Sequence, residues 1–303
     1  MQKYVMVSAV VAVALGGGGA LAAGPKVVRD GADEVLYLDD LANPKRWGPA
    51  ECTLAVSKQR PPSGRGALHV HIPVDHHAGE KNYPIGWPRL YLNLTGDEKP
   101  WTDFERFEFM VHATMTREKP PKQVLNLQVQ CPDRQRTYRQ NLPEIRLGQW
   151  VRVSVPLREV KNVADVARLG FNISESDYRH GEKLDFRFGA FRLARAAEFG
   201  LARLDVRSRV MYADRPTLKL VLDVVGPQRK IGKGVPLTIR RAGKAVHQQA
   251  VPVTRGIQTV WIDLAKARLE PGTYTVAAFA ADAAREKTAS FRVVESPWKE
   301  ASK

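Results

Sequence analysis

The sequence lacks the features that mark several common protein classes. Only two of its 303 residues are cysteine, Cys52 and Cys131, so at most one internal disulfide can form. No run after the N-terminal residues is apolar enough for a membrane-spanning helix, and no long helix is indicated. Neither a G-x-S-x-G nucleophile elbow nor an H-E-x-x-H zinc-binding helix occurs. A membrane-embedded protein and the hydrolases that those motifs define are therefore not indicated.

The N-terminal residues predict a secretion signal. Lys3 precedes an apolar run over residues 5–15, and residues 20–22 have the A-x-A form of a signal-peptidase site. The run is too short to span a bilayer; a retained anchor or a poorly packed strand are the alternatives. No cysteine follows the small residues, so a lipoprotein anchor is not indicated. We expect residues 1–23 to be a signal peptide, which places the protein in the periplasm or outside the cell with no membrane span.

Acidic residues are in the minority, because 47 Lys and Arg outnumber 32 Asp and Glu and give a net charge of +15. Residues 201–303 hold 19 basic and 9 acidic residues, whereas residues 24–200 hold 27 and 23. The basic C-terminal third could bind an acidic cell-surface polymer or a protein partner. A solvated basic face that keeps the protein soluble is the alternative interpretation. Nucleic-acid binding is not indicated, because no binding motif occurs in a chain that is expected to be exported.

Apolar and polar residues alternate in short segments that are separated by Pro- and Gly-containing turns. About ten such segments precede residue 195, and a further series follows residue 201. Within residues 184–193 the alternation changes parity, which predicts a β-bulge at Gly189 and Ala190. Residues 163–168 and 194–199 are the short helical candidates. The pattern predicts an all-β protein made of two β-sandwiches.

Three segments resemble the jelly-roll sandwiches of the galactose-binding-like superfamily, in particular family 11 carbohydrate-binding modules. They are residues 101–109 (WTDFERFEF), 147–157 (LGQWVRVSVPL) and 184–193 (LDFRFGAFRL). The resemblance covers residues 35–195 and implies a jelly-roll β-sandwich with a carbohydrate ligand. Residues 269–276 (LEPGTYTV) resemble a strand region of bacterial immunoglobulin-like or fibronectin-type accessory domains, which act as spacers or docking modules.

These resemblances predict a jelly-roll domain over residues 24–197, an immunoglobulin-like β-sandwich over residues 201–295 and a flexible tail over residues 296–303. Related modules often carry an Asp-Asp pair that helps to hold a structural calcium ion. This chain has Gly189 and Ala190 there, although Asp39 and Asp40 remain in the N-terminal strand. Because a hard cation needs several oxygen ligands, a calcium site is left incomplete, and no other cofactor is indicated.

Polar residues that alternate with the predicted core positions would lie together on an outward sheet face. Amides and guanidinium groups supply paired donors and acceptors for sugar hydroxyls, and aromatic rings pack against the apolar side of a pyranose. Glu108 and Gln140 share the same alternation but are not counted as ligand-binding. An ordinary solvated sheet face is the alternative. The candidate ligand-binding residues are Trp87, Arg89, Tyr91, Asn93, His112, Asn126, Gln128, Gln130, Tyr138 and Tyr178.

Metal and disulfide chemistry have weaker signals. His69 and His71 point to one side of a predicted strand, and with Asp39 they are the candidate metal ligands. No second cluster supplies the remaining ligands of a zinc site, so no metal is predicted. Cys52 and Cys131 share parity with core residues, which fits either a disulfide in an oxidising compartment or two separate buried thiols.

Three functions remain open from the sequence. The first is an exported, non-catalytic protein that recognises a carbohydrate on the polar face of the jelly roll. The second is a structural or assembly protein of the envelope that binds protein partners. The third is a polysaccharide-cleaving enzyme, for which no nucleophile-and-base signature occurs. The acid, base and charge-neutralising groups available to such an enzyme are Glu108, Glu175, Asp177, His112, Tyr138 and Arg89.

Overall fold

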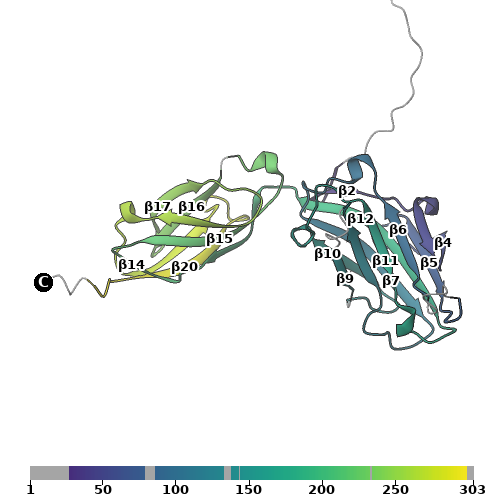
Figure 1. Ribbon diagram of the computed structural model, residues 1–303. Helices are drawn as coiled ribbons and strands as arrows, with labels where there is room; N and C mark the ends of the chain where they lie inside the picture. Colours follow the sequence, from purple (N-terminus) through teal and green to yellow (C-terminus); the bar gives the residue numbers. More distant parts are fainter. Residues whose placement is uncertain (1–26, 79–85, 133–137, 143, 233, 299–303) are drawn as a thin grey trace, which may run out of the picture.

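The computed structural model describes residues 27–78, 86–132, 138–142, 144–232 and 234–298, and it contains two β-sandwiches joined end to end (Figure 1). The all-β prediction is confirmed. The predicted signal peptide lies outside the described residues. Helical segments in the described part of the chain are three-residue 3-10 turns, and none of them could cross a lipid bilayer.

The first sandwich contains a seven-stranded sheet organised around the long strand β12. One edge of β12 pairs with β7, and β7 pairs in turn with β10. The other edge pairs first with β5 and then with β2, while β4 and β1 lie outside those two strands. The strands are β1 (Val28–Asp30), β2 (Asp33–Tyr37), β4 (Thr53–Val56), β5 (Ala67–Pro73), β7 (Arg106–Met115), β10 (Trp150–Pro156) and β12 (Lys183–Ala196).

A bulge interrupts β12 where it pairs with β7. The pairing register with β7 shifts between Gly189 and Arg192, and Ala190 adopts a φ of +53°. Both Phe188 and Phe191 therefore point into the core. At Gly189 a Cβ atom would lie 2.7 Å from Cγ of Pro61, so no larger residue fits without displacing that ring. The predicted bulge is confirmed.

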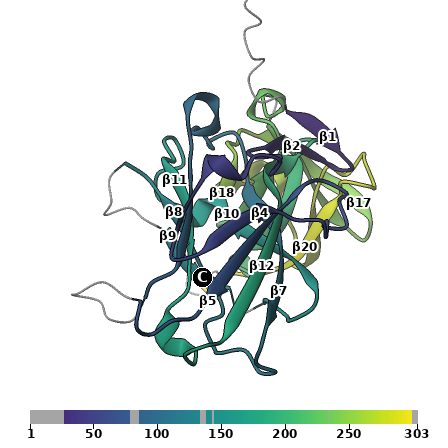
Figure 2. The same cartoon turned by 90° about the vertical axis from the view of Figure 1, so that its right-hand side faces the viewer.

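The opposing layer is a five-stranded antiparallel sheet with the order β3-β6-β11-β8-β9. Viewed from the side, β8, β9 and β11 form one layer and β5, β7 and β12 the other (Figure 2). The central row of its outer face runs from Tyr91 through Gly170 to Gln128. The strands are β3 (Trp47–Ala50), β6 (Arg89–Asn93), β8 (Asn126–Gln130), β9 (Tyr138–Asn141) and β11 (Arg168–Asn172).

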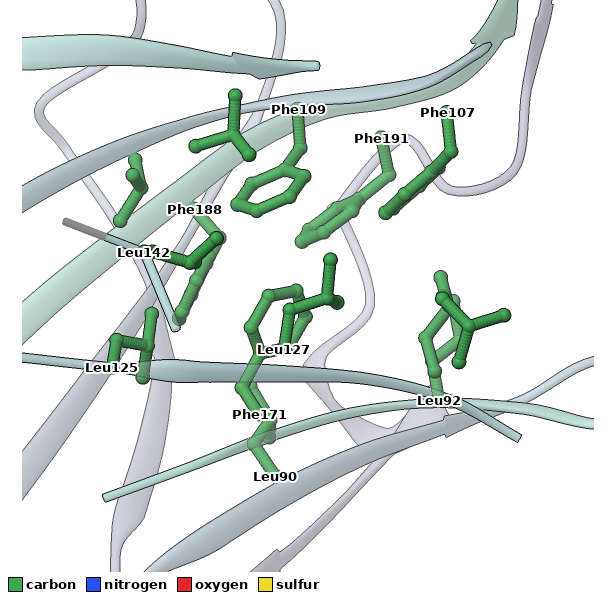
Figure 3. Close-up of a cluster of buried hydrophobic side chains, with 14 of the residues drawn as sticks. Leu90, Leu92, Phe107, Phe109, Leu125, Leu127, Leu142, Phe171, Phe188 and Phe191 are labelled. Carbon is green, nitrogen blue, oxygen red and sulfur yellow. The ribbon is translucent and has the colours of Figure 1, made fainter. Parts of the chain in front are cut away.

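Phenylalanine rings from both sheets meet in the core between them (Figure 3). Phe171 of the five-stranded sheet lies 4.6 Å from Phe188 and 5.3 Å from Phe109 of the other sheet, measured between ring centroids. Phe191 stacks on Phe109 at 5.4 Å, and Phe107 extends the stack at 6.2 Å. Burying each ring contributes about 1.5–3 kcal/mol, so this core fixes both sheets and the outward side chains on them.

The second sandwich packs the three-stranded sheet β13-β15-β18 against the five-stranded sheet β14-β20-β19-β16-β17. Its buried apolar residues, from Leu201 to Val293, form a cluster separate from that of the first sandwich, which ends at Leu193. Only the β14–β20 pair is parallel among the described pairs. The strands are β13 (Gly200–Val206), β14 (Val210–Tyr212), β15 (Thr217–Val225), β16 (Val235–Arg241), β17 (Lys244–Val251), β18 (Gly256–Asp263), β19 (Gly272–Ala278) and β20 (Lys287–Val294).

Neither short helical candidate is a helix: residues 163–168 begin as a connecting turn, whereas residues 194–196 are strand. Residues 194–196 continue β12, because Ala194 pairs with Val35 on one side and Arg106 on the other. Residues 163–164 form a turn before β11 begins at Arg168. Residues 194–196 pair with β2, and Ala194 also pairs with β7, so the sheet satisfies backbone groups that a single helical turn would leave largely unsatisfied.

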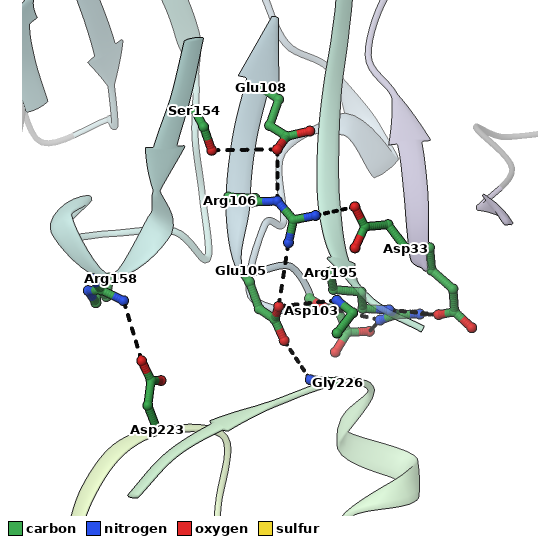
Figure 4. A network of polar contacts seen from close by, with 12 residues as sticks. Asp33, Asp103, Glu105, Arg106, Glu108, Ser154, Arg158, Arg195, Asp223 and Gly226 are labelled. Atoms are coloured by element: carbon green, nitrogen blue, oxygen red, sulfur yellow. Dashed lines mark hydrogen bonds and ion pairs between the residues drawn. The ribbon is translucent and has the colours of Figure 1, made fainter. Parts of the chain in front are cut away.

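Polar contacts join the two sandwiches (Figure 4). Glu105, which immediately precedes β7, accepts from the backbone N–H of Ala196 at 3.1 Å and from that of Gly226 at 2.5 Å, so one carboxylate contacts both units. Arg158 lies 3.8 Å from Asp223 across the junction. Further contacts run from Arg229 to Glu34 at 3.2 Å and from Lys230 to the carbonyl of Ala197 at 2.9 Å.

Candidate functional site

The outer face of the five-stranded sheet in the first sandwich is rich in amides and arginines. Its outward side chains come from the three central strands β6, β11 and β8. None of the outward positions on the described strands of this sheet is Asp or Glu. We call this surface the amide face, and its residues are Arg89, Tyr91, Asn93, Asn126, Gln128, Gln130, Arg168 and Asn172.

Three of these amides form a directed hydrogen-bond chain. Nε2 of Gln130 donates to Oε1 of Gln128 at 3.0 Å, and Nε2 of Gln128 donates to Oδ1 of Asn172 at 2.9 Å. Gln128 is only 7% exposed and Asn172 only 9%, so neighbouring side chains hold both amides in place. The chain runs in one direction, which leaves the Asn172 amide nitrogen at one end and the Gln130 amide oxygen at the other for hydrogen bonds with a ligand.

Gly170 lies buried beneath the Tyr91 ring in the centre of the amide face. It occupies the outward position of the middle strand, between Tyr91 on β6 and Gln128 on β8. A Cβ atom at this position would lie 3.2 Å from Cδ1 of Tyr91 and 3.6 Å from Cβ of Gln128. The tyrosine ring therefore covers the glycine and packs beside Gln128, in the space that a side chain at position 170 would need.

Aromatic rings and guanidinium groups surround this centre. Arg168 donates from Nε to Oδ1 of Asn93 at 2.7 Å, and its guanidinium lies 5.0 Å from the centre of the Tyr91 ring. At the end of β6, the Arg89 guanidinium lies 5.7 Å from the Trp87 ring, which is 47% exposed. The face thus combines planar donors with apolar ring surfaces.

Seven of the ten predicted ligand-binding residues lie on this face or at its end, namely Trp87, Arg89, Tyr91, Asn93, Asn126, Gln128 and Gln130. Sequence reasoning missed the contribution of β11. Arg168, Gly170 and Asn172 alternate with Leu169 and Phe171 in the same period-2 pattern, which was the available signal.

The grouping of His112 with this face is wrong, and so is that of Glu108. Both lie on β7 and point outward from the seven-stranded sheet, on the opposite side of the sandwich. Alternation shows whether a side chain points inward or outward, but it does not show to which sheet a strand belongs. His112 is buried beside the Trp150 ring at 5.5 Å, and burial together with the charge of Arg187 lowers its pKa.

Tyr138 is also misplaced, together with Gln140. Tyr138 pairs with Val129 and packs against the apolar core, whereas the outward positions of β9 are Arg139 and Asn141. Its hydroxyl donates to Oε1 of Gln140 at 2.8 Å and lies 3.3 Å from Oε2 of Glu159. Burial and the Glu159 charge raise the pKa of Tyr138 to about 12. Residues 133–137, which precede β9, lie outside the described residues.

Replacing Tyr138 with phenylalanine should leave ligand binding unchanged, because the hydroxyl does not reach the amide face. Loss of its hydrogen bonds to Gln140 and Glu159 should lower the free energy of unfolding by about 1 kcal/mol or less. Urea denaturation together with a binding assay measures both quantities. A large loss of binding with unchanged stability would return Tyr138 to the ligand site.

Tyr178, the remaining predicted residue, is a core residue. It is 3% exposed, and its hydroxyl donates to the backbone carbonyl of Val124 at 2.9 Å. Burial raises its pKa. Tyr178 therefore anchors the loop before β8 and offers no surface to a ligand.

The outer face of the seven-stranded sheet carries a network of charges around Glu108 (Figure 4). The buried Glu108 carboxylate accepts from Nε of Arg106 at 2.8 Å, from Arg152 at 2.5 Å and from Nε of Arg192 at 3.0 Å. Arg106 also contacts Asp33, and Arg192 contacts Asp30. Burial alone would raise the pKa of Glu108, but hydrogen bonds from Arg152 and Arg106 lower it below its usual value. These contacts occupy Glu108 structurally, which does not favour a catalytic role.

The three candidate metal ligands do not form one site, because Asp39 lies apart from His69 and His71. His69 and His71 both contact Oδ1 of Asp185, at 2.7 and 2.9 Å. Asp39 is buried elsewhere, where its two oxygens accept from the Trp47 indole at 2.9 Å and from the backbone of Leu41 at 2.7 Å. In the described ranges, no three or more His, Cys, Asp or Glu side chains converge as metal ligands would.

Cys52 and Cys131, both among the described residues, are not joined by a disulfide. The thiol of Cys52 lies 3.5 Å from the carbonyl of Arg89, and that of Cys131 lies 3.2 Å from the carbonyl of Asn162. Burial raises the pKa of Cys52 to about 11, so this thiol is protonated and unreactive near neutral pH. The sequence left open whether Cys52 and Cys131 are bridged to each other, and in the structure they are not.

No protein-family model matches this chain, and no curated protein is significantly similar to it. Among solved structures, it is similar to an exo-β-agarase, with 9% identity, a TM-score of 0.36 and coverage of 54% of this chain and 24% of that one. A β-1,2-glucanase from Parabacteroides distasonis shows 15% identity, a TM-score of 0.36 and coverage of 88% and 37%. The adhesin domain of Epf from Streptococcus pyogenes shows 10% identity, a TM-score of 0.27 and coverage of 88% and 89%.

The agarase and the glucanase are carbohydrate-active proteins by name. The alignments span about a quarter and somewhat over a third of the length of those two proteins. With TM-scores below 0.5, these similarities assign neither a family nor an activity to this chain.

Proposed function

We propose that this chain is an exported carbohydrate-binding protein that holds its ligand on the amide face without cleaving it. The observation that carries the proposal is the amide chain from Gln130 through Gln128 to Asn172 beside the Tyr91 ring, which packs on Gly170. A fixed amide can donate to one sugar hydroxyl and accept from its neighbour, and an aromatic ring beside it offers a flat face to the apolar side of a pyranose.

The surroundings of the amide chain fit a sugar ligand. Tyr91 and the exposed Trp87 offer ring faces for the apolar side of a pyranose, while Arg89 and Arg168 add charged donors. Because the hydrogen bonds among Gln130, Gln128 and Asn172 order these side chains before a ligand arrives, binding requires little further ordering of this part of the site.

Binding without hydrolysis is proposed from the residue types on this face. Glycosidases use two carboxyl groups that flank the scissile bond, about 5–9.5 Å apart. The described outward positions of the five-stranded sheet hold no carboxylate, and Glu108 is engaged by three arginines on the other side of the sandwich. The resemblance of residues 35–195 to family 11 carbohydrate-binding modules supports this proposal. In it, the second sandwich acts as a spacer or docking module.

The proposal is tested by affinity electrophoresis of the protein expressed without residues 1–23. Each gel contains one neutral polysaccharide. We expect at least one glucan or galactan to retard the wild type. The double variant Tyr91→Ala with Gln128→Ala should lose at least about tenfold in affinity, since it removes a ring face and the central link of the amide chain. The matched control is Arg187→Ala with Thr114→Ala, on the outer face of the other sheet, and it should bind normally. Equal retention of the wild type and the Tyr91–Gln128 variant would contradict the proposal.

Protein docking is the second candidate function, and one observation favours it. On β18, the edge strand of the second sandwich, Ile257 is 56% exposed and Trp261 63% exposed. Exposed apolar residues of this size often mark an interaction surface. If no polysaccharide in a broad panel retards the wild type, docking through the second sandwich becomes the better account.

A further inference from the structure

The second sandwich carries a basic groove along its open edge. Strand β13 lies at the edge of the three-stranded sheet, and β14 covers only the C-terminal part of β20 in the other sheet. The groove between β13 and β20 has a volume of about 710 Å³. Four arginines line it, together with three exposed hydroxyl side chains. These residues are Arg203, Arg207, Arg209, Arg292, Thr273, Thr288 and Ser290.

Most of the charge in this groove is not neutralised by the protein. Arg203 pairs with Asp205, which is the single carboxylate among the lining residues. Arg207, Arg209 and Arg292 are exposed and make no ion pair with any carboxylate among the described residues. The first sandwich differs, because the guanidinium groups around Glu108 are all satisfied by carboxylates.

We propose that this groove binds an acidic polysaccharide through its carboxylate groups. A guanidinium group presents two parallel N–H donors that match the two oxygens of a carboxylate. Three unpaired arginines along one groove can contact successive uronate residues, and Thr273, Thr288 and Ser290 add neutral donors and acceptors on the same wall. This second site lies on a different domain from the amide face and does not depend on it.

The groove suits a polysaccharide better than a nucleic acid. Single-stranded nucleic acids are usually held by aromatic side chains on which the bases stack. The one aromatic residue that lines the groove, Phe291, is 2% exposed and belongs to the core. The predicted secretion signal also directs the chain away from the compartments that hold nucleic acids.

Binding to polygalacturonate, measured by biolayer interferometry on the protein that lacks residues 1–23, tests the groove. The triple variant Arg207→Ala, Arg209→Ala and Arg292→Ala should bind at least tenfold more weakly than the wild type. The corresponding triple lysine variant should fall between the two, because it keeps the charge and loses the paired donors. Raising the salt concentration should weaken the wild type more than the alanine variant.

A matched control removes three positive charges elsewhere on the second sandwich. Arg215, Lys244 and Lys266 are exposed, do not line the groove and make no ion pair with the described carboxylates. Their triple alanine variant should bind within twofold of the wild type.

Equal losses in both triple variants, or unchanged binding in the groove variant, would overturn the proposal. Tighter binding of duplex DNA than of polygalacturonate would also overturn it. The Tyr91–Gln128 variant should bind polygalacturonate normally, so failure at one site is distinguishable from failure at the other.

Discussion

Replacing Glu108 with alanine is expected to lower the free energy of unfolding of the first sandwich by about 2–3 kcal/mol. The carboxylate is 3% exposed and accepts hydrogen bonds from Arg106, Arg152 and Arg192. Its removal leaves mutually repelling guanidinium groups side by side on β7, β10 and β12. Arg106 and Arg192 keep a second carboxylate partner each, so the loss should remain below that of a fully isolated buried charge.

Urea denaturation followed by tryptophan fluorescence measures this loss, because Trp47 and Trp101 are both buried in the first sandwich. The control is Asp165→Ala, which removes an ion pair with Lys99 whose side chains are 47% and 39% exposed. That control should change stability by no more than about 0.5 kcal/mol. A loss below about 1 kcal/mol for Glu108→Ala would mean that the network contributes little.

The same network predicts how stability depends on pH. The folded-state pKa of Glu108 lies below its usual value, so its stabilising contribution is complete above the unfolded pKa of about 4.3. That contribution is lost as the pH falls through the lower folded pKa. The stability difference between wild type and Glu108→Gln should therefore be constant from about pH 6 to 8 and shrink below about pH 4.

Replacing Gly170 with leucine should weaken carbohydrate binding about 30-fold, or about 2 kcal/mol. Any side chain at this position would meet Tyr91 at its first atom, 3.2 Å from Cδ1, and would push that ring away from its place beside Gln128. The backbone of Gly170 is not in the left-handed region, so we expect the variant to fold once the Tyr91 ring has moved aside.

Titration calorimetry with the polysaccharide that retards the wild type measures this effect. The matched control is Gly200→Leu, because Gly200 begins β13 of the second sandwich and a Cβ atom there meets no atom within 4 Å. Thermal denaturation of both variants separates a blocked site from a damaged fold. Unchanged affinity in a folded Gly170→Leu protein would show that ligand binding does not depend on the position of the Tyr91 ring.

Much of the fold can be predicted from period-2 alternation alone. The pattern placed Phe171 and Phe188 in the core, and its change of parity located the bulge at Gly189 and Ala190. These predictions succeed because burial of one sheet face forces a repeat of two residues, and a slip of one residue would expose the whole apolar set.

The candidate site was predicted only in part, for a physical reason. Alternation carries no information on which strands are neighbours, so His112 was grouped with residues from the opposite sheet. The alternation in β8 does not show which residues of β9 point outward, because the loop between the two strands can shift the pattern by one residue. Tyr138 was therefore assigned to the wrong face of the sheet. The contribution of Gly170 could not be predicted either, because a missing side chain gains meaning only from the neighbours that the fold supplies.

The most direct test of the central claim is an NMR titration of the side-chain amide groups with an oligosaccharide of the polysaccharide that binds. We predict that the NH₂ signals of Gln128, Gln130 and Asn172 shift together and saturate at one ligand concentration. The His69 and His112 ring signals on the opposite sheet should not move. Shifts confined to that opposite sheet, or no shift in any of the three amides at saturating ligand, would contradict the account.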